Sequence, residues 1–196
     1  MEILAVNSGS SSFKFKLFVM PEEKVIASGQ IERIGQMGSI VTIKHHDGEK
    51  YERKDNIKNH KEAVQELMDL LLELRIIKDY SEIDGVGHRV VAGGEYFDHS
   101  VIVDDNVIAK IHEIAEMAPL HNPANLVGIE AFKKILPQAT SVVVFDTAFH
   151  QTIPEENFIY SVPYEWYEKY GVRRYGAHGT SHRYVAGEAA KLLGRP

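Results

Sequence analysis

The chain of 196 residues contains no cysteine, and neither a long apolar run nor a block of basic residues occurs anywhere in it. The lack of cysteine excludes disulfide bonds and thiolate metal sites, and it is compatible with the cytoplasm. A membrane-spanning helix would need about 20 apolar residues, and the first residues lack the regions of a signal peptide. The net charge of −6 gives no basic footprint for nucleic acid. We therefore expect a cytoplasmic protein that binds neither membranes nor nucleic acid.

The amino-terminal part of the chain has the pattern of a β-meander. An apolar run at residues 3–6 is followed by a polar turn at 7–12 and by alternating apolar and lysine residues at 13–17. This pattern predicts a β-hairpin, because alternate residues of a strand face opposite sides of the sheet. Further strands are expected at 25–34 and 39–44.

Later in the chain the apolar spacing switches between helix and strand. Helices are predicted from Asn59 as N-cap to 76, at 104–117, from Asn122 as N-cap to 136, and from Thr180 or Ser181 as N-cap to 194, and strands at 84–91 and 141–145. This order predicts an α/β fold with a mixed sheet, whose first strands are antiparallel and whose later strands are inserted by crossovers, with flanking helices. An irregular, aromatic segment predicts a boundary between a domain at 1–150 and the start of a second domain at 151–196.

The turn of the first hairpin is dense in hydrogen-bond donors. Gly9 is expected to adopt a positive φ, Ser10 and Ser12 offer hydroxyl and backbone N–H groups, and Lys14 adds a positive charge in the returning strand. Such a turn can hold an anion, most simply a phosphate. An ordinary polar hairpin remains the alternative.

Four other polar residues stand in loops or at strand ends. They are Arg89 in GHRVVAGGE, His121 in APLHNPAN, Asp146 in VFDTAFHQ and His178 in YGAHGTSH. Taken singly, each has a structural explanation as a surface ion pair or a helix cap. Their combination with the serine hairpin favours a functional site.

Metal and hydrolase chemistry fit the sequence less well. His178 and His182 are one helical turn apart, as zinc ligands can be, but no Glu lies between them and no third ligand is obvious. His45 and His46 point to opposite faces of a strand and are expected to be solvated turn residues. No G-x-S-x-G motif supports a serine hydrolase.

The runs NSGSSSFK, GHRVVAGGE, APLHNPAN, VFDTAFHQTIP and YGAHGTSH, in this order and spacing, resemble the amino-terminal half of the acetate kinases, the acetokinase family. The resemblance extends from Ile3 to Gly194. It implies a ribonuclease-H-like fold of the superfamily of acetate and sugar kinases, Hsp70 and actin. It also implies phosphoryl transfer from ATP to acetate with Mg²⁺, giving acetyl phosphate and ADP, in a homodimer. Members of the family continue through a second domain, so the resemblance implies an amino-terminal fragment that is inactive alone.

The resemblance also implies roles on the nucleotide side of the reaction. Asn7 corresponds to the family's magnesium-associated asparagine, and Lys14 corresponds to the lysine that contacts the nucleotide phosphates. Ser10 and Ser12, from the same hairpin, are expected to contact the nucleotide as well.

On the acceptor side, Arg89 corresponds to the arginine that binds the substrate carboxylate, which it can hold bidentately. His121 corresponds to an active-site histidine, Asp146 to the catalytic aspartate, and His178 to the histidine that stabilises the transferring phosphoryl group. Acetate is ionised at neutral pH and needs no general base. Asp146 is therefore expected mainly to orient Mg²⁺ or its waters.

Two positions depart from the family pattern. Ala92 stands where histidine is frequent, and Ala177 stands where phenylalanine is frequent. Both changes leave the charged residues in place, but they keep a propionate or butyrate kinase open as an alternative. A non-catalytic nucleotide-binding module of the same fold is the other alternative.

Overall fold

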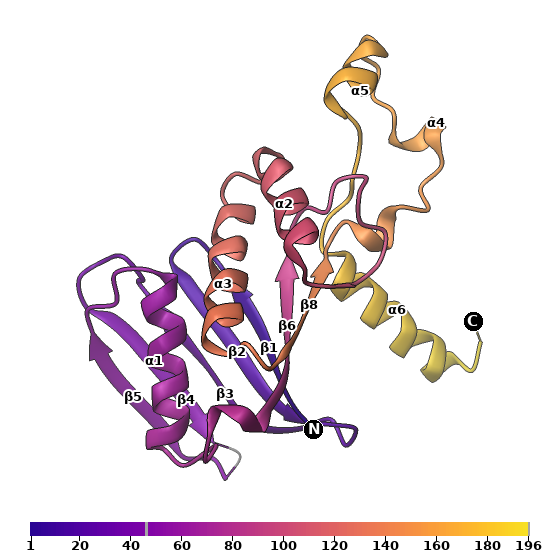
Figure 1. Cartoon of the computed structure of the whole chain (residues 1–196). Helices are drawn as coiled ribbons and strands as arrows, with labels where there is room; N and C mark the ends of the chain where they lie inside the picture. Colours follow the sequence, from indigo (N-terminus) through magenta and orange to yellow (C-terminus); the bar gives the residue numbers. More distant parts are fainter. Residues whose placement is uncertain (46, 196) are drawn as a thin grey trace.

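The structure is a computed structural model that describes residues 1–45 and 47–195, so His46 lies outside the described residues. Within them the chain forms an eight-stranded sheet with the order β5-β4-β3-β2-β1-β6-β8-β7 (Figure 1). The strands are β1 (Glu2–Ser8), β2 (Ser12–Val19), β3 (Lys24–Glu32), β4 (Ser39–His45), β5 (Lys50–Asp55), β6 (Ile83–Val90), β7 (Val101–Ile102) and β8 (Thr140–Phe145).

The sheet is mixed, as the sequence predicts. Strands β1 to β5 form an antiparallel meander, whereas β6 pairs in parallel with β1, and β8 pairs in parallel with β6. The short β7 is antiparallel to β8 at the edge. Strands β5 and β7 were not predicted, because β5 is mostly charged and exposed and β7 has two residues. An edge strand buries too little surface to show a clear apolar pattern.

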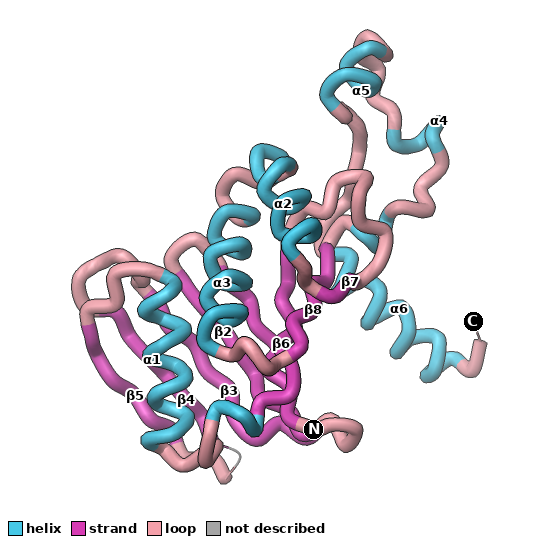
Figure 2. Tube along the Cα trace, viewed as in Figure 1, coloured by secondary structure: helices cyan, strands magenta, loops and turns pink. Residues whose placement is uncertain are grey.

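The helices are α1 (His60–Glu73), α2 (Asp105–Glu113), α3 (Asn122–Ile135), α4 (Glu155–Phe158), α5 (Glu165–Tyr170) and α6 (Gly179–Leu193). Three short 3₁₀ turns, η1 (Tyr80–Glu82), η2 (Ala115–Met117) and η3 (Ala148–His150), lie between them. Figure 2 shows how loops dominate the chain between β8 and α6. Among the described residues, no helix is long and apolar enough to cross a membrane.

The first hairpin and two helices build the main core. Helices α1 and α3 lie on the same face of the sheet (Figure 1). Phe13, Phe15 and Leu17 are buried in the core on that face, whereas Lys14 and Lys16 are exposed on the other. The alternation predicted from the sequence is therefore confirmed, and the face of β2 that carries Lys14 and Lys16 is exposed.

The start of α1 is as predicted, but the start of α3 is not. The Asn59 side chain caps α1 by accepting a hydrogen bond from the Glu62 backbone N–H. Helix α3 begins at Asn122, one residue earlier than predicted, with His121 at the N-cap. The Asn122 side chain cannot cap the helix, because it bonds both backbone groups of Ala92, at 3.0 and 2.9 Å.

The chain after η3 departs from the sheet. Helices α4 and α5 stand beyond α2 and away from the strands, and α6 then runs out toward the carboxyl terminus (Figure 1). The expected irregularity of this segment agrees with these short helices. The proposed domain boundary near residue 150 stays a prediction.

Candidate active site

Three neighbouring strands place polar side chains at one edge of the sheet. Asn7 is next to last in β1, Arg89 is next to last in β6, and Asp146 directly follows β8. Since these strands are parallel, their carboxyl ends meet at the same edge, where α/β sheets commonly bind ligands. Residues that are up to 139 positions apart in the sequence, 146 minus 7, are thereby brought together.

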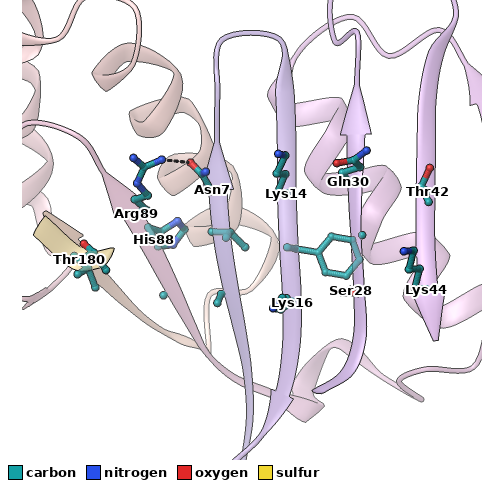
Figure 3. A pocket seen from close by; sticks show the side chains of 16 residues that line it. Asn7, Lys14, Lys16, Ser28, Gln30, Thr42, Lys44, His88, Arg89 and Thr180 are labelled. Atoms are coloured by element: carbon teal, nitrogen blue, oxygen red, sulfur yellow. Dashed lines mark hydrogen bonds between the residues drawn. The ribbon is translucent and has the colours of Figure 1, made fainter. Parts of the chain in front are cut away.

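Arg89 and Asp146 form the central ion pair of this edge. The Arg89 Nη2 lies 2.6 Å from Asp146 Oδ2, and Nε lies 3.0 and 3.2 Å from the two carboxylate oxygens. The Asp146 side chain is only 2% exposed, whereas that of Arg89 is 36% exposed. Nη1 of Arg89 turns to Asn7 Oδ1 at 3.5 Å (Figure 3). The guanidinium is thus held by Asp146 on its Nε and Nη2 edge and by a longer contact of Nη1 with Asn7, and Arg89 lines the hollow beside it.

The beginning of α6 is built on Asp146. The Gly179 N–H donates to the Asp146 backbone carbonyl at 2.8 Å, and the Thr180 hydroxyl donates to Asp146 Oδ1 at 3.1 Å. The prediction of Thr180 or Ser181 as N-cap is wrong, since the helix begins at Gly179. The Thr180 hydroxyl serves the carboxylate instead of a backbone N–H.

His178 occupies the N-cap position of α6 in a left-handed conformation, with φ of 55°. With Arg89, Asp146 and Thr180 it lines a hollow of about 630 Å³. The structure therefore brings together the predicted residues Arg89, Asp146 and His178, with Asn7 beside Arg89. The left-handed backbone conformation of His178 was not indicated by the sequence.

The serine hairpin differs in detail from the prediction. Gly9 does not have a positive φ. Its N–H donates to the Ser12 carbonyl at 2.7 Å, and a Cβ at Gly9 would lie 3.0 Å from Ser12 Oγ. A side chain at position 9 would therefore crowd the Ser12 hydroxyl, which would have to move slightly aside. Ser10 is exposed at the tip of the hairpin. Neither Ser10 nor Ser12 lines the hollow beside His178 or the second hollow, beside Lys14, that is described next.

Lys14 stands across from Asn7 in the register of the hairpin, on the open face of the sheet (Figure 3). The two residues line a second hollow of about 610 Å³, which shares Arg89 and Thr180 with the first. This hollow continues over β3 and β4, where it is lined by Ser28, Gln30, Thr42 and Lys44. These four residues were not predicted from the sequence, although their alternation along the predicted strands could have indicated that they share the face of Lys14.

His121 is exposed at the N-cap of α3 and makes no side-chain capping bond. It is not among the described residues that line the two hollows. Its predicted role is therefore not supported by direct proximity, and it remains a prediction.

Asn125 is a residue of the APLHNPAN motif that the sequence analysis did not assign. It is buried, its Nδ2 donates to the Ser8 carbonyl at 2.6 Å, and its Oδ1 accepts from the Val91 N–H at 3.3 Å. It thus ties the end of β1 to the end of β6. The burial that demands these partners is seen only in the structure, so the sequence alone carried no clear signal for this role.

His88 neighbours Arg89 in the sequence but faces the core. It is 3% exposed and lies edge-on to Phe132, with Nε2 3.4 Å from Ser141 Oγ. Burial lowers the pKa of His88 to about 3, so the ring is neutral at physiological pH. It does not add a positive charge to the site.

The oxygen atoms at this edge fit magnesium better than zinc. The ring centroids of His178 and His182 lie 6.4 Å apart. Among the described residues, no three His, Cys, Asp or Glu side chains are grouped so that they could hold a metal ion. The zinc alternative thus gains no support. Asn7 and Asp146 offer amide and carboxylate oxygens, the ligand type of Mg²⁺, which takes few protein ligands and completes its shell with water and phosphate.

An antiparallel meander extended by parallel strands, with polar residues at the ends of β1, β6 and β8, defines a domain of the superfamily of acetate and sugar kinases, Hsp70 and actin. Within it, the chain belongs to the acetokinase family, whose family model matches residues 2–196. It is 62% identical to the acetate kinase of Fructilactobacillus sanfranciscensis over 195 residues and 57% identical to that of Bacillus subtilis.

Solved structures give the same result. The chain superposes on the acetate kinase of Porphyromonas gingivalis with a TM-score of 0.94 at 47% identity, covering 100% of this chain and 49% of that one. A propionate kinase from Francisella tularensis gives 0.92 at 41% identity, covering 99% and 49%. The alignments with the Fructilactobacillus and Bacillus enzymes include 100% of this chain but only 49% of each enzyme. The chain therefore spans about half the length of these relatives.

Proposed function

We propose that this chain supplies the acceptor-binding and phosphate-contacting residues of an ATP:acetate phosphotransferase. An acetate oxygen attacks the γ-phosphorus of ATP, a new P–O bond forms, and the bond to the β-phosphate oxygen breaks to release ADP. Little covalent help is needed for this transfer, so positioning and positive charge are the main contributions of the protein. Membership of the acetokinase family also favours a cytoplasmic homodimer.

The observation that carries the proposal is the geometry of Arg89. Asp146 occupies the Nε and Nη2 edge of the guanidinium, at 3.0 and 2.6 Å. On the Nη1 side the guanidinium makes only the long 3.5 Å contact with Asn7, so a second, planar anion can bind there, beside the hollow that Lys14 also lines. A carboxylate matches that fork, which a lysine would not provide. We assign the acetate carboxylate to this edge.

The remaining assignments rest on the family motifs, and of these residues Lys14 and His178 line the hollows beside Arg89. Lys14 is assigned to the nucleotide phosphates, together with the hairpin serines Ser10 and Ser12. His178 is assigned to the equatorial oxygens of the transferring phosphoryl group, where added positive charge or a hydrogen bond is most effective. His121 is retained as a residue of the acceptor side.

Asn7 and Asp146 would hold Mg²⁺, which would neutralise charge on the phosphates of bound ATP. Asp146 has a second task in this proposal, because its carboxylate fixes Arg89 before any substrate arrives. A group that is positioned in advance loses little freedom when the reaction occurs.

The test is a hybrid in which this chain replaces the matched half of the Fructilactobacillus sanfranciscensis acetate kinase. Acetyl phosphate is measured as the hydroxamate, with the intact relative as the reference and this chain alone as a second sample. Formation of acetyl phosphate by the hybrid is the expected result. A hybrid that folds and binds ATP without forming an acyl phosphate would instead favour the non-catalytic nucleotide-binding module.

A propionate kinase is the second candidate, because the Francisella tularensis propionate kinase superposes nearly as well as the acetate kinase. Ala177, beside His178, is exposed and small, so it does not narrow the site. The same assay with propionate and butyrate compares kcat/KM among the three acids. Higher kcat/KM for propionate than for acetate would replace the acetate assignment, and Ala177→Phe would then be expected to lower it.

A further inference from the structure

His178 is presented by an unusual piece of backbone. Gly176 and His178 both have left-handed φ values, 78° and 55°. The conformation is uncommon for a histidine, so neighbouring contacts must maintain it. The direction in which the His178 ring enters the site therefore depends on what holds residues 176–179.

Two contacts hold this segment, and both come from the turn after β8. At its far end, the Gly179 N–H donates to the Asp146 carbonyl at 2.8 Å. At its near end, Nε2 of His150 lies 2.9 Å from the carbonyl oxygen of Ala177. Because a carbonyl can only accept, His150 carries its proton on Nε2 and donates it.

The ring of His150 also fills the space above Gly176. A Cβ at Gly176 would lie only 2.4 to 2.9 Å from three atoms of the His150 side chain. The ring thus packs directly on the glycine backbone, and it lies edge-on to His182 with the centroids 5.6 Å apart. His150 therefore restrains the segment both by a hydrogen bond and by packing.

We infer that His150 is a positioning residue that sets the orientation of His178. This inference rests on the proposed function only for its kinetic consequence, because the contacts are a property of the fold. His150 itself is not assigned to the substrates. It acts on the reaction through the carbonyl of Ala177 and the backbone that follows.

Three substitutions separate the two contributions of His150. His150→Ala removes both the donor and the ring, His150→Phe keeps a ring without the donor, and His150→Gln keeps a donor near the position of Nε2. His112→Ala is the matched control, because His112 is an exposed histidine of α2, outside both hollows. All are measured in the hybrid enzyme described above, by acyl phosphate formation.

We expect His150→Ala to lower kcat by about tenfold to a hundredfold with little change in the KM for ATP or acetate, as a small misplacement of a reacting group does. His150→Gln should restore most of this loss, and His150→Phe should restore less. In a double-mutant cycle, His150→Ala should cost little in a His178→Ala background, because the residue it positions is already gone. An unchanged kcat in His150→Ala, or equal costs in both backgrounds, would overturn the inference.

A second readout uses this chain alone and does not depend on activity. The backbone amide signals of residues 177–179 and the imidazole signals of His178 are compared by NMR in the parent, His150→Ala and His112→Ala proteins. Larger shifts in His150→Ala than in His112→Ala support the inference, and equal shifts contradict it. If the hybrid forms no acyl phosphate, the proposed function fails, while these spectra still decide the role of His150.

Discussion

Arg89 and Asp146 approach within 2.6 Å at the carboxyl ends of two neighbouring parallel strands, with the Asp146 side chain buried and the Arg89 side chain partly exposed. A buried carboxylate that loses its cation is left without compensation for its lost hydration. At the same time, Arg89 keeps one edge for an anion. The pair therefore stabilises the fold, and it also holds the Arg89 guanidinium in position before an anion binds.

Arg89→Ala is expected to lower the free energy of unfolding by about 1–3 kcal/mol, less than for a fully buried pair because Arg89 is partly exposed. Arg89→Lys should recover part of the stability but not acetate binding, since it lacks the fork. Urea unfolding and the KM for acetate in the hybrid enzyme measure the two effects. As a control, Lys133→Ala breaks an exposed pair with Asp105 and should leave the free energy of unfolding close to that of the parent. Similar losses in both variants would contradict the central role of Arg89.

Asp146→Asn should raise the Mg²⁺ concentration needed for half-maximal activity in the hybrid enzyme. The amide keeps the size of the side chain but is a weaker ligand for a hard cation than a carboxylate. Activity is measured across a Mg²⁺ titration at several pH values. An unchanged Mg²⁺ dependence together with a shifted pH profile would show instead that Asp146 acts mainly on protons.

Two glycines of α6 give a matched pair of substitutions. A Cβ at Gly179 would lie 2.3 Å from the Asp146 carbonyl oxygen, whereas a Cβ at Gly187 meets nothing within 4 Å. Gly179→Ala should therefore displace the start of α6 and His178, and lower both kcat and the melting temperature. Gly187→Ala should stabilise the chain by roughly 0.5–1 kcal/mol, because alanine favours a helix. Equal melting temperatures for the two variants would contradict this account.

The sequence predicted the fold well where periodic burial is strong. The alternation over residues 13–17, the capped helix after Asn59 and the apolar strand 141–145 all appear in the structure. It failed where tertiary partners decide the outcome. Asn122 looks like a helix cap from its neighbours alone, but its side chain is used by Ala92, which is distant in sequence.

The same distinction applies to the site. The motifs indicated Asn7, Arg89, Asp146 and His178, and the structure places the first three at the carboxyl ends of β1, β6 and β8 and His178 at the N-cap of α6. Local sequence could not show that Asp146 holds Arg89. That contact depends on the register between β6 and β8, which only the assembled sheet defines.

His88 provides a test of stability against pH. Burial lowers its pKa from 6.5 to about 3 in the folded chain, so the unfolded chain binds a proton more readily. The contribution of His88 to stability is thus fully present above pH 6.5 and declines as the pH falls from 6.5 toward 3, by at most about 1.4 kcal/mol per pH unit.

Replacing His88 by leucine should therefore flatten the fall in unfolding free energy between pH 6.5 and 4.5, a window of about 2 pH units in which the folded ring stays neutral. The loss of the Phe132 contact lowers stability at every pH, so the slope and not the absolute value is compared. Urea unfolding is measured at intervals across the window for the parent, His88→Leu and His112→Leu chains. Because His112 is exposed, its replacement should leave the slope close to that of the parent. Parallel slopes for the parent and His88→Leu would mean that His88 takes up its proton equally in the folded and unfolded chains.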